Sequence, residues 1–587
     1  NGSEKTVIAQ ERAAENRVQC FNIKKNNNKW SWLAEIKSIP DFKCISPKQI
    51  NVMICSRNNG FGHPIQVQIP RIKQAIPIFI LFRALGIIED RKICSLILLN
   101  IEAKKMERML FALKASIIEA NKYLTQEEAL NYINGMFAFA IWDKLKKELT
   151  LVRDPFGKKP LLYSINNKEI TFASDLNSLE KIIDNNQINP LAVESLFKLR
   201  FIYDPLTIYE NVYKLLPGHI ITFSDKGVKN TRWYNLLNYS QEEVNHSLIT
   251  NNIRNYFDAA VKRRLVSDVD IGVFLSGGLD SSLIVASIAE QGFKYPCFTM
   301  GFAGASKYYE ERPQAARLAK HYGMKHEEFE IDETTVIKNI PEIFEACDEP
   351  FADTSAIPFY MLSKQVSSNV KVVLSGDGGD EVFGGYRKHI GEKWSALPFL
   401  IPKFIREIII DLLIENKNTS YGEISRKIRR YLMNISREGS ERQANWLEQI
   451  NENTIKNLLG NNFESTKNLL EVYRSPFQDP INSMLAADLG FSLPGDMLVK
   501  TDRMSMANSL EIRSPFLDKN LVEYAFSLPG NLKIGSFKGK KILKDSFKQR
   551  LPKWSISAPK KGFEIPIADW LKSELKSLVE NSCSKKI

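Results

Sequence analysis

The sequence has few cysteines and no long apolar run, and both shortages restrict what the protein can be. Seven cysteines occur in 587 residues, without a Cys-x-x-Cys pair. This low density argues against a disulfide-stabilised scaffold and favours a reducing, cytoplasmic setting. The most apolar windows, 76–88 and 397–414, are interrupted by charged residues, so neither predicts a membrane span. No charged-then-apolar leader is found at the start, so no secretory signal is expected.

The sequence also lacks a strong excess of one charge. Lys and Arg number 80 against 68 Asp and Glu, which gives a formal charge of +12, and no dense basic stripe occurs in the first 133 residues. This mild bias suits anionic substrates such as ATP and makes nucleic acid an unlikely partner. The length is that of about four domains, and the composition, with 44% hydrophobic and 25% charged residues, is typical of globular proteins.

One glycine-rich segment predicts a phosphate-binding site. Residues 273–282 read Val-Phe-Leu-Ser-Gly-Gly-Leu-Asp-Ser-Ser, in which a buried strand (269–275) runs into a turn and then a helix. Glycines allow close approach of an anion, and N–H groups at a helix start favour negative charge. The candidate phosphate contacts are Ser276, Gly277, Gly278, Ser281 and Ser282, and Asp280 is a candidate magnesium ligand. The alternative is a tight turn with a capped helix.

The surrounding residues, 251–390, alternate between the two types of secondary structure. Strands are predicted at 269–275, 297–301, 327–331 and 370–374, and helices at 281–290, 312–321, 335–346 and 357–366. Such alternation indicates an open, doubly wound parallel sheet with helices on both faces, whose ligands bind at the carboxyl ends of the strands.

A second glycine-rich loop follows the last of these strands. Residues 375–386 read Ser-Gly-Asp-Gly-Gly-Asp-Glu-Val-Phe-Gly-Gly-Tyr. Three acids at this density repel one another unless they surround a cation, so Asp280 and Asp380 are the predicted magnesium pair. Ser375 and Gly376 are expected to offer backbone groups to the nucleotide. A calcium-binding EF-hand is the competing interpretation, but the spacing lacks its acidic ladder and late glutamate.

Two different patterns precede this part of the chain. Residues 135–143, 149–152 and 170–174, together with the stretch 205–223, predict short antiparallel strands joined by turns. Residues 1–133 contain a strand signal, a proline-bounded turn and a helix at 78–85, with no visible chemistry.

The chain from 134 to 587 resembles the glutamine-hydrolysing asparagine synthetase family. The resemblance rests on the segments 276–282, 347–355, 375–386 and 498–518. It implies a truncated glutaminase-like β domain at 134–235 and an α/β synthetase domain of the ATP-pyrophosphatase type, with added helices, at 236–587. Residues 1–133, through 1–12 and 70–86, resemble an α+β fragment of the second-largest subunit of multisubunit RNA polymerases, so the chain reads as a chimera. No active-site residue is carried over from that subunit.

The resemblance implies that aspartate and ATP form β-aspartyl-AMP, which ammonia converts to asparagine, with release of AMP and pyrophosphate. The adenosine is expected near Leu275, Met300 and Gly376. Lys541 is favoured as the catalytic lysine, from the family context Lys-x-Leu-Lys/Arg. The alternative is that all the lysines of this lysine-rich stretch are solvated. Asp377 is expected to help deprotonate ammonia.

The departure from the family lies at the front. The family's glutaminase begins with a cysteine nucleophile whose own α-amine is the base, and an internal cysteine has that nitrogen locked in an amide. Glutaminase activity is therefore expected to be lost and ammonia to be the nitrogen source. Two alternatives stay open, an amidotransferase acting on a sugar or peptide carboxylate and a polymerase-derived binding fragment with an inert synthetase half. The resemblance is also compatible with a homodimer.

Overall fold

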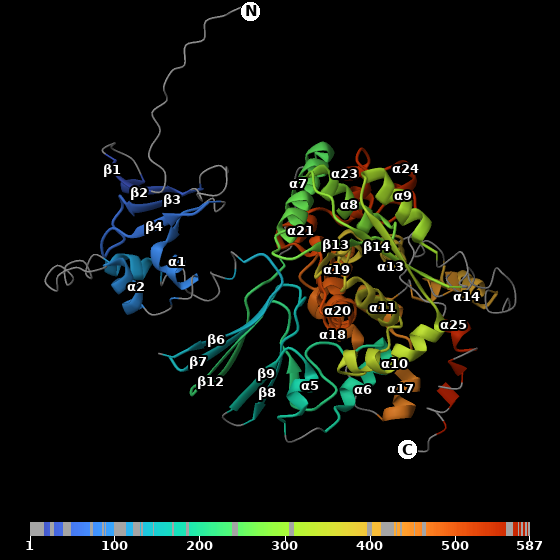
Figure 1. Cartoon of the computed structure of the whole chain (residues 1–587). Helices are drawn as coiled ribbons and strands as arrows, with labels where there is room; N and C mark the ends of the chain where they lie inside the picture. Colours follow the sequence, from blue (N-terminus) through green and yellow to red (C-terminus); the bar gives the residue numbers. More distant parts are fainter. Residues whose placement is uncertain are drawn as a thin grey trace, which may run out of the picture. The chain divides into compact units, whose positions relative to one another are not determined.

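The chain forms two compact units, residues 1–133 and 134–587 (Figure 1). The computed structural model describes residues 17–23, 29–38, 48–70, 74–84, 87, 90–98, 113–120, 130, 133–144, 146–166, 169–183, 187–236, 245–303, 310–395, 402–412, 428–429, 431–434, 437–450, 452–460, 465–558, 567–572, 575–576, 579–580 and 584. Within these residues, no helix is long and apolar enough to cross a bilayer.

The first unit is an antiparallel sheet covered by helices. Its strands follow one another in chain order, β1 (Val18–Asn22), β2 (Trp30–Ser38), β3 (Lys48–Cys55), β4 (Ile65–Gln68) and β5 (Ile76–Pro77). The helices α1 (Ile78–Ala84) and α2 (Asp90–Ile97) follow. The core includes Val67 from the sheet and Phe79 and Ile93 from the helices, all almost fully buried. The predicted helix at 78–85 is confirmed as α1.

The second unit begins with two antiparallel sheets. One has the order β12 (Gly227–Arg232), β11 (His219–Ser224), β7 (Glu148–Arg153) and β6 (Ala138–Asp143), and the other β10 (Val212–Lys214), β8 (Leu162–Asn166) and β9 (Glu169–Ala173). Leu151 and Ile221 from the first sheet share a core with Leu161 and Leu215. The helices α5 (Leu176–Glu180) and α6 (Pro190–Leu199) follow β9. The predicted antiparallel strands are confirmed.

A five-stranded parallel sheet forms the centre of the rest. Its order is β15 (His326–Ile331), β14 (Cys297–Phe302), β13 (Ile271–Phe274), β16 (Val372–Leu374) and β17 (Glu511–Arg513). Between the strands lie α8 (Leu279–Glu290), α9 (Arg312–Tyr322), α10 (Glu333–Cys347) and α11 (Ala356–Val366). The predicted doubly wound fold is confirmed. After β13 the chain adds β14 and β15 on one side of that strand, and then returns to add β16 on its other side. The crevice between β13 and β16 is therefore a topological switch point.

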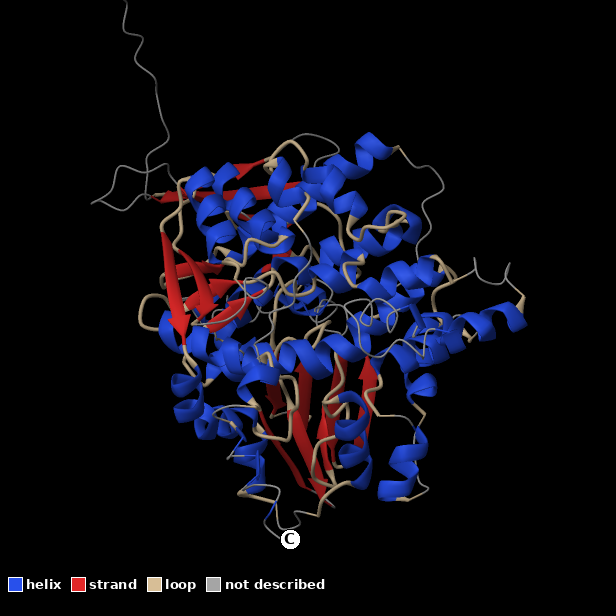
Figure 2. Ribbon diagram, turned by 90° about the vertical axis from the view of Figure 1, so that its right-hand side faces the viewer, coloured by secondary structure: helices blue, strands red, loops and turns tan. Residues whose placement is uncertain are grey.

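Helices make up most of the rest of this part of the chain (Figure 2). They are α7 (His246–Arg264), α12 (Gly379–Phe383), α13 (Arg387–Lys393), α14 (Lys403–Leu412), α16 (Gly439–Leu447), α17 (Glu452–Leu459), α18 (Thr466–Arg474), α19 (Pro480–Ala487), the π-helix η2 (Asp488–Met497), α20 (Leu498–Met506), the 3-10 helix η3 (Pro515–Leu517), α21 (Lys519–Ser527), α22 (Gly530–Lys533), α23 (Lys541–Phe547), α24 (Lys553–Ile556) and α25 (Ile567–Trp570). Phe298 and Met300 of β14 pack in one core with Phe359 of α11 and Met504 of α20.

Candidate active site

The first glycine-rich corner is a tight turn between β13 and α8. Gly277 has a φ of +72°, and a Cβ there would lie 3.0 Å from the backbone nitrogen of Ala315, so a side chain is excluded on two grounds. Ser276 Oγ accepts from the Gly278 N–H at 3.2 Å, and Ser282 Oγ donates to the Gly278 carbonyl at 2.6 Å. These bonds fix the turn at the N-terminus of α8, where the backbone N–H groups favour an anion.

The second corner follows β16 and touches the first. The Ser375 N–H donates to the carbonyl of Arg513 in β17 at 2.9 Å, and Ser375 Oγ donates to Asp377 Oδ2 at 2.5 Å. A Cβ on Gly376 would lie 2.8 Å from the Cβ of Asp280. Glycine at 376 therefore allows the two corners to meet at the switch point of the sheet.

A lysine ammonium joins the acids of the two corners. Lys540 Nζ forms ion pairs with Asp280 and, at 2.6 Å, with Asp380 Oδ1. The lysine is 5% exposed. Burial opposes its charge, but the two carboxylates overcome burial and raise the pKa of Lys540. The site thus holds a permanent cation between the two predicted phosphate-binding loops.

The predicted lysine and its neighbour differ in their surroundings. Lys541 is exposed, whereas Lys540 is buried between the acids. The reason is local geometry. Lys540 takes a left-handed conformation with φ of 57° just before α23 begins, which turns consecutive side chains in different directions. Lys540 is therefore the lysine that lies between the acids, and the role expected of Lys541 stays a prediction.

The two predicted metal ligands, Asp280 and Asp380, suit magnesium only when a nucleotide is bound as well. No cluster of three or more His, Cys, Asp or Glu side chains that could hold a metal is present in the described ranges. Mg²⁺ in nucleotide sites typically takes one or two carboxylates and completes its shell with phosphate oxygens and water. Asp280 and Asp380, which meet at Lys540, match such a donor set.

Two of the predicted adenosine contacts lie on neighbouring strands, Leu275 directly after β13 and Met300 within β14, and both side chains are packed inward. Leu275 is 1% and Met300 3% exposed, and the Leu275 N–H donates to the Phe298 carbonyl at 2.9 Å. Ser281 and Ser282 are also buried at the start of α8. Because these side chains are covered, we expect backbone groups and the neighbouring surface to offer contacts to the nucleotide base.

Asp377 lies beside a charged cluster that the sequence reasoning did not identify. Lys500 of α20 donates to Asp353 Oδ2 at 2.8 Å and to Ser355 Oγ at 2.6 Å, and Thr501 Oγ1 approaches Asp377 Oδ2 at 3.5 Å. Burial disfavours the charge of Asp353, but Lys500 overcomes it and lowers the Asp353 pKa to about 2. Both residues occur in motifs that signalled the family, 347–355 and 498–518, although no role was assigned to either.

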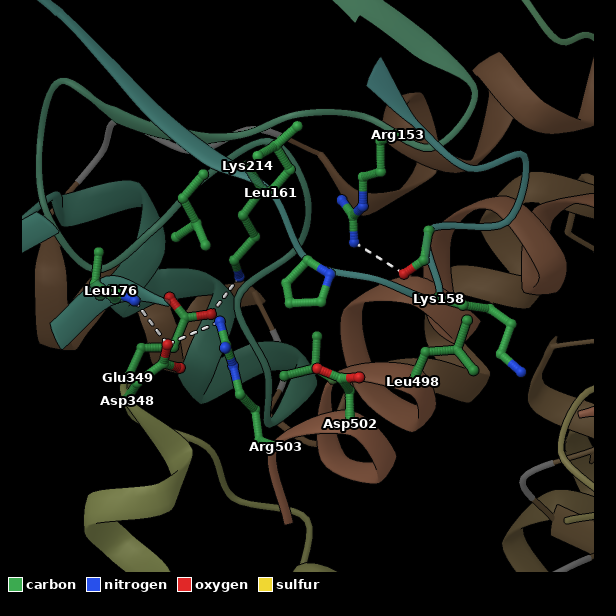
Figure 3. A pocket seen from close by; sticks show the side chains of 14 residues that line it. Arg153, Lys158, Leu161, Leu176, Lys214, Asp348, Glu349, Leu498, Asp502 and Arg503 are labelled. Atoms are coloured by element: carbon green, nitrogen blue, oxygen red, sulfur yellow. Dashed lines mark hydrogen bonds and ion pairs between the residues drawn. The ribbon is translucent and has the colours of Figure 1, made fainter. Parts of the chain in front are cut away.

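A small cavity lies where the antiparallel part meets the synthetase part (Figure 3). Its volume is about 20 Å³, which is room for a water-sized molecule. Ion pairs cross it, from Lys214 to Glu349, from Arg503 to Asp348 at 2.8 Å and from Lys159 to Asp502 at 2.8 Å. The first and last of these pairs join the antiparallel part to the residue Glu349 after α10 and to α20, and the second pair joins α20 to the end of α10.

Comparisons with known proteins agree with this architecture. Residues 252–586 match the family model described as asparagine synthase, residues 117–234 that of a glutamine amidotransferase domain, and residues 14–154 that of RNA polymerase Rpb2, domain 2. The last two matches overlap at 117–154, and the division between the compact units falls within this overlap.

Curated relatives cover most of the second unit. The chain is 31% identical over 464 residues to asparagine synthetase [glutamine-hydrolyzing] 1 of Bacillus subtilis, a match that covers 78% of this chain and 72% of the relative. It is 30% identical over 465 residues to a putative asparagine synthetase of Mycobacterium tuberculosis, covering 76% of this chain and 69% of the relative. An amidase of Gibberella zeae, chry2, is 24% identical over 485 residues, covering 75% and 71% of the two chains.

Proposed function

Because the chain belongs to the asparagine synthase family, whose members are carbon–nitrogen ligases that use ATP, we propose that it converts aspartate to asparagine through β-aspartyl-AMP, with ammonia as the nitrogen source. The observation that carries this proposal is Lys540, held by Asp280 and Asp380 where the two glycine-rich corners meet. A triphosphate bound across the two corners, as proposed below, would react beside this fixed cation.

ATP is proposed to bind across the switch point. Its pyrophosphate portion is assigned to the turn 276–278 and the backbone N–H groups at the N-terminus of α8, since the hydroxyls of Ser281 and Ser282 are buried and bond to the Gly278 carbonyl. Its α-phosphate is assigned to the side of Ser375 and Gly376. Asp280 and Asp380 would hold Mg²⁺, which neutralises phosphate charge when bound. The lysine ammonium then lies beside the phosphates rather than only between carboxylates.

The first step is proposed as attack of the aspartate β-carboxylate on the α-phosphorus. A carboxylate oxygen forms the new bond to phosphorus, and the bond to the β-phosphate oxygen breaks, so pyrophosphate leaves. Negative charge accumulates on the phosphoryl oxygens, and Lys540 stabilises it from a fixed position. The buried, preorganised position of its ammonium is what makes the lysine effective.

In the second step, ammonia attacks the acyl carbon and the carbon–oxygen bond to AMP breaks. The attacking nitrogen must lose a proton, and Asp377 is proposed to accept it. Ser375 Oγ and Thr501 Oγ1 contact the same Asp377 oxygen, at 2.5 and 3.5 Å, and orient the carboxylate. The balance is aspartate, ATP and ammonia to asparagine, AMP and pyrophosphate.

Ammonia is proposed as the nitrogen source because the amidotransferase-like part lacks the nucleophile that glutamine hydrolysis needs. Residues 117–234, which match that domain, contain no cysteine. Cys297 and Cys347 of the synthetase part are buried, and burial raises their thiol pKa values to about 12 and about 11, which opposes thiolate formation.

The test uses the full chain with aspartate, MgATP and either ammonium chloride or glutamine. With ammonium we expect AMP and asparagine in equal amounts, and with glutamine neither product nor glutamate. Glutamate release from glutamine would reject the loss of glutaminase activity alone. AMP formation that does not depend on aspartate but does depend on another carboxylate in a panel would identify that carboxylate as the substrate. Formation of ADP instead of AMP would reject the acyl-adenylate intermediate.

A further inference from the structure

The turn that contains residues 153–159 is held rigidly although it belongs to the amidotransferase-like part. The carboxylate of Asp154 accepts the N–H groups of Phe156, Lys158 and Lys159 at 3.0, 3.1 and 2.9 Å. Arg153 bonds to the Gly157 carbonyl at 3.0 Å. The backbone of Lys158 is therefore fixed, and only its side chain can adjust.

The Lys158 side chain is buried without a fixed partner. It is 8% exposed and lines the cavity at the junction. Among the residues that the structure describes, none forms a hydrogen bond or ion pair with its Nζ. Figure 3 shows the side chain running away from the ion-paired end of the cavity at Arg503 and Glu349. A buried ammonium in such a place is costly unless an anion joins it.

The cavity lining places Lys158 against the synthetase helix α20, because Leu498, Val499 and Asp502 of that helix line the same cavity. Burial lowers its pKa to about 7, the charge of Arg264 acts in the same direction, and the charge of Asp377 opposes them. Thr501 of the same helix approaches Asp377, the carboxylate to which the proton-accepting role is assigned, at 3.5 Å. The other buried lysines near this point already form ion pairs. Lys500 pairs with Asp353, and Lys540 pairs with Asp280 and Asp380.

The proposed substrate brings a carboxylate that takes no part in the reaction. Aspartate has an α-carboxylate and an α-ammonium in addition to the β-carboxylate that attacks ATP. A buried cation that gains its partner only when substrate binds discriminates strongly against acceptors lacking that group, because the cation is then left unpaired.

We propose that Lys158, supplied by the amidotransferase-like part, binds the α-carboxylate of the acceptor amino acid and selects aspartate over simpler carboxylates. This inference rests on the proposed function. It gives the truncated part a role in synthesis that does not depend on glutamine hydrolysis.

The experiment compares two acceptors in three variants of the full chain. β-Alanine is aspartate without its α-carboxylate. AMP release is measured with saturating MgATP and ammonium for the unchanged chain, Lys158→Met and Lys158→Arg. Lys159→Met is the matched control, since it removes the same charge from the same turn but from an ammonium already paired with Asp502.

For Lys158→Met we expect kcat/KM for aspartate to fall about 10- to 100-fold, as for loss of a charged hydrogen bond. The low rate with β-alanine and the KM for ATP should not change. Lys158→Arg should recover part of the loss, and Lys159→Met should retain the aspartate preference.

Two results would overturn the inference. One is an equal fall in kcat/KM for aspartate and for β-alanine in Lys158→Met, which would indicate a structural role. The other is a change confined to the KM for ammonia, which assigns Lys158 to the path of the nucleophile. Absence of aspartate-dependent AMP release in the unchanged chain would instead reject the proposed function itself.

Discussion

At the residue scale, the ammonium group of Lys540 is the feature that the site has in addition to its two glycine-rich turns. Lys540 is one of several lysines in the stretch 538–544, which have the same chemistry in the sequence. What separates Lys540 from Lys541 is backbone direction and burial, and neither can be derived from residue type. The family pattern in the sequence favoured Lys541, whereas Lys540 is the lysine that lies between the two acids.

Substitution of Lys540 tests this assignment. Lys540→Met is expected to lower kcat for AMP formation about 100- to 1,000-fold, the usual effect of removing one preorganised donor to a developing charge. Lys541→Met should stay close to the unchanged chain, because its side chain is exposed. Equal losses for the two variants in a pyrophosphate-release assay would contradict the assignment.

Gly277 offers a second test at the residue scale. Gly277→Ala adds a Cβ 3.0 Å from the Ala315 nitrogen and strains a backbone with φ of +72°. We expect the KM for ATP to rise about tenfold or more, since 1.4 kcal/mol of lost binding corresponds to a factor of ten. Gly292→Ala is the control, because Gly292 also has a positive φ, +78°, but open space around it. A similar ATP effect in both variants would assign the loss to general strain.

At the element scale, a buried charge network ties the helices behind the second corner together. Glu392 of α13 accepts from Arg442 of α16 at 2.7 Å and from Arg474 of α18 at 3.0 Å, and it is 2% exposed. Nearby, His389 of α13 bonds through Nε2 to Asp488 Oδ2 of η2 at 2.7 Å. The helices that continue from the 375–386 loop are thus held by charge pairs as well as by apolar packing.

Removal of one member of this network should destabilise the protein strongly. Glu392→Gln is expected to lower the free energy of unfolding by about 3 kcal/mol or more, because two guanidinium groups lose their buried partner. The matched change, Glu438→Gln, removes an exposed partner of Lys467 and should leave the urea midpoint in place. Comparable midpoints for the two variants would show that the buried network contributes no more than the surface pair.

The helix α22 contains a buried lysine that makes stability depend on pH. Lys533 is fully buried, its Nζ lies 4.1 Å from the Phe526 ring centre, and burial lowers its pKa from 10.5 to about 7, against the charge of Asp479. Between these two values the unfolded chain holds a proton that the folded chain has released. Stability from this group therefore rises with pH from about 7 to 10.5.

Lys533→Met should remove this contribution. We expect a variant that is more stable than the unchanged chain near pH 7, with a difference that shrinks as the pH approaches 10. Urea unfolding at several pH values measures the difference directly. A constant difference across this range would mean that the lysine is protonated in the folded protein.

The elements themselves were largely predictable, and the exceptions have physical reasons. The strands now seen as β13 to β16 and the helices α8 to α11 match the predicted alternation, because apolar runs and helical periodicity mark both. The edge strand β17 was missed. Its three residues, Glu511 to Arg513, include two charged side chains, so no apolar run reveals it, and only its pairing with β16 makes it a strand. Lys500 and Asp353 were missed because their contact joins residues far apart in the chain.

At the scale of the whole molecule, the two compact units have different relatives. Residues 252–586 match asparagine synthase, whereas 14–154 match a domain of an RNA polymerase subunit. The amidotransferase-like residues form antiparallel sheets and make ion pairs with Asp502 of α20 and with Glu349, which follows α10. We therefore expect the synthetase chemistry to persist without glutamine hydrolysis. The boundary near residue 235, between the amidotransferase-like part and the synthetase part, is a prediction.

The most direct test of the central claim follows oxygen from aspartate. The full chain is incubated with MgATP, ammonium and aspartate whose β-carboxylate is labelled with oxygen-18. The masses of the products are then measured by mass spectrometry. An acyl adenylate passes one labelled oxygen to AMP when ammonia breaks the carbon–oxygen bond, so the account predicts one oxygen-18 in each AMP and none in pyrophosphate. Unlabelled AMP, or label in phosphate released together with ADP, would contradict it.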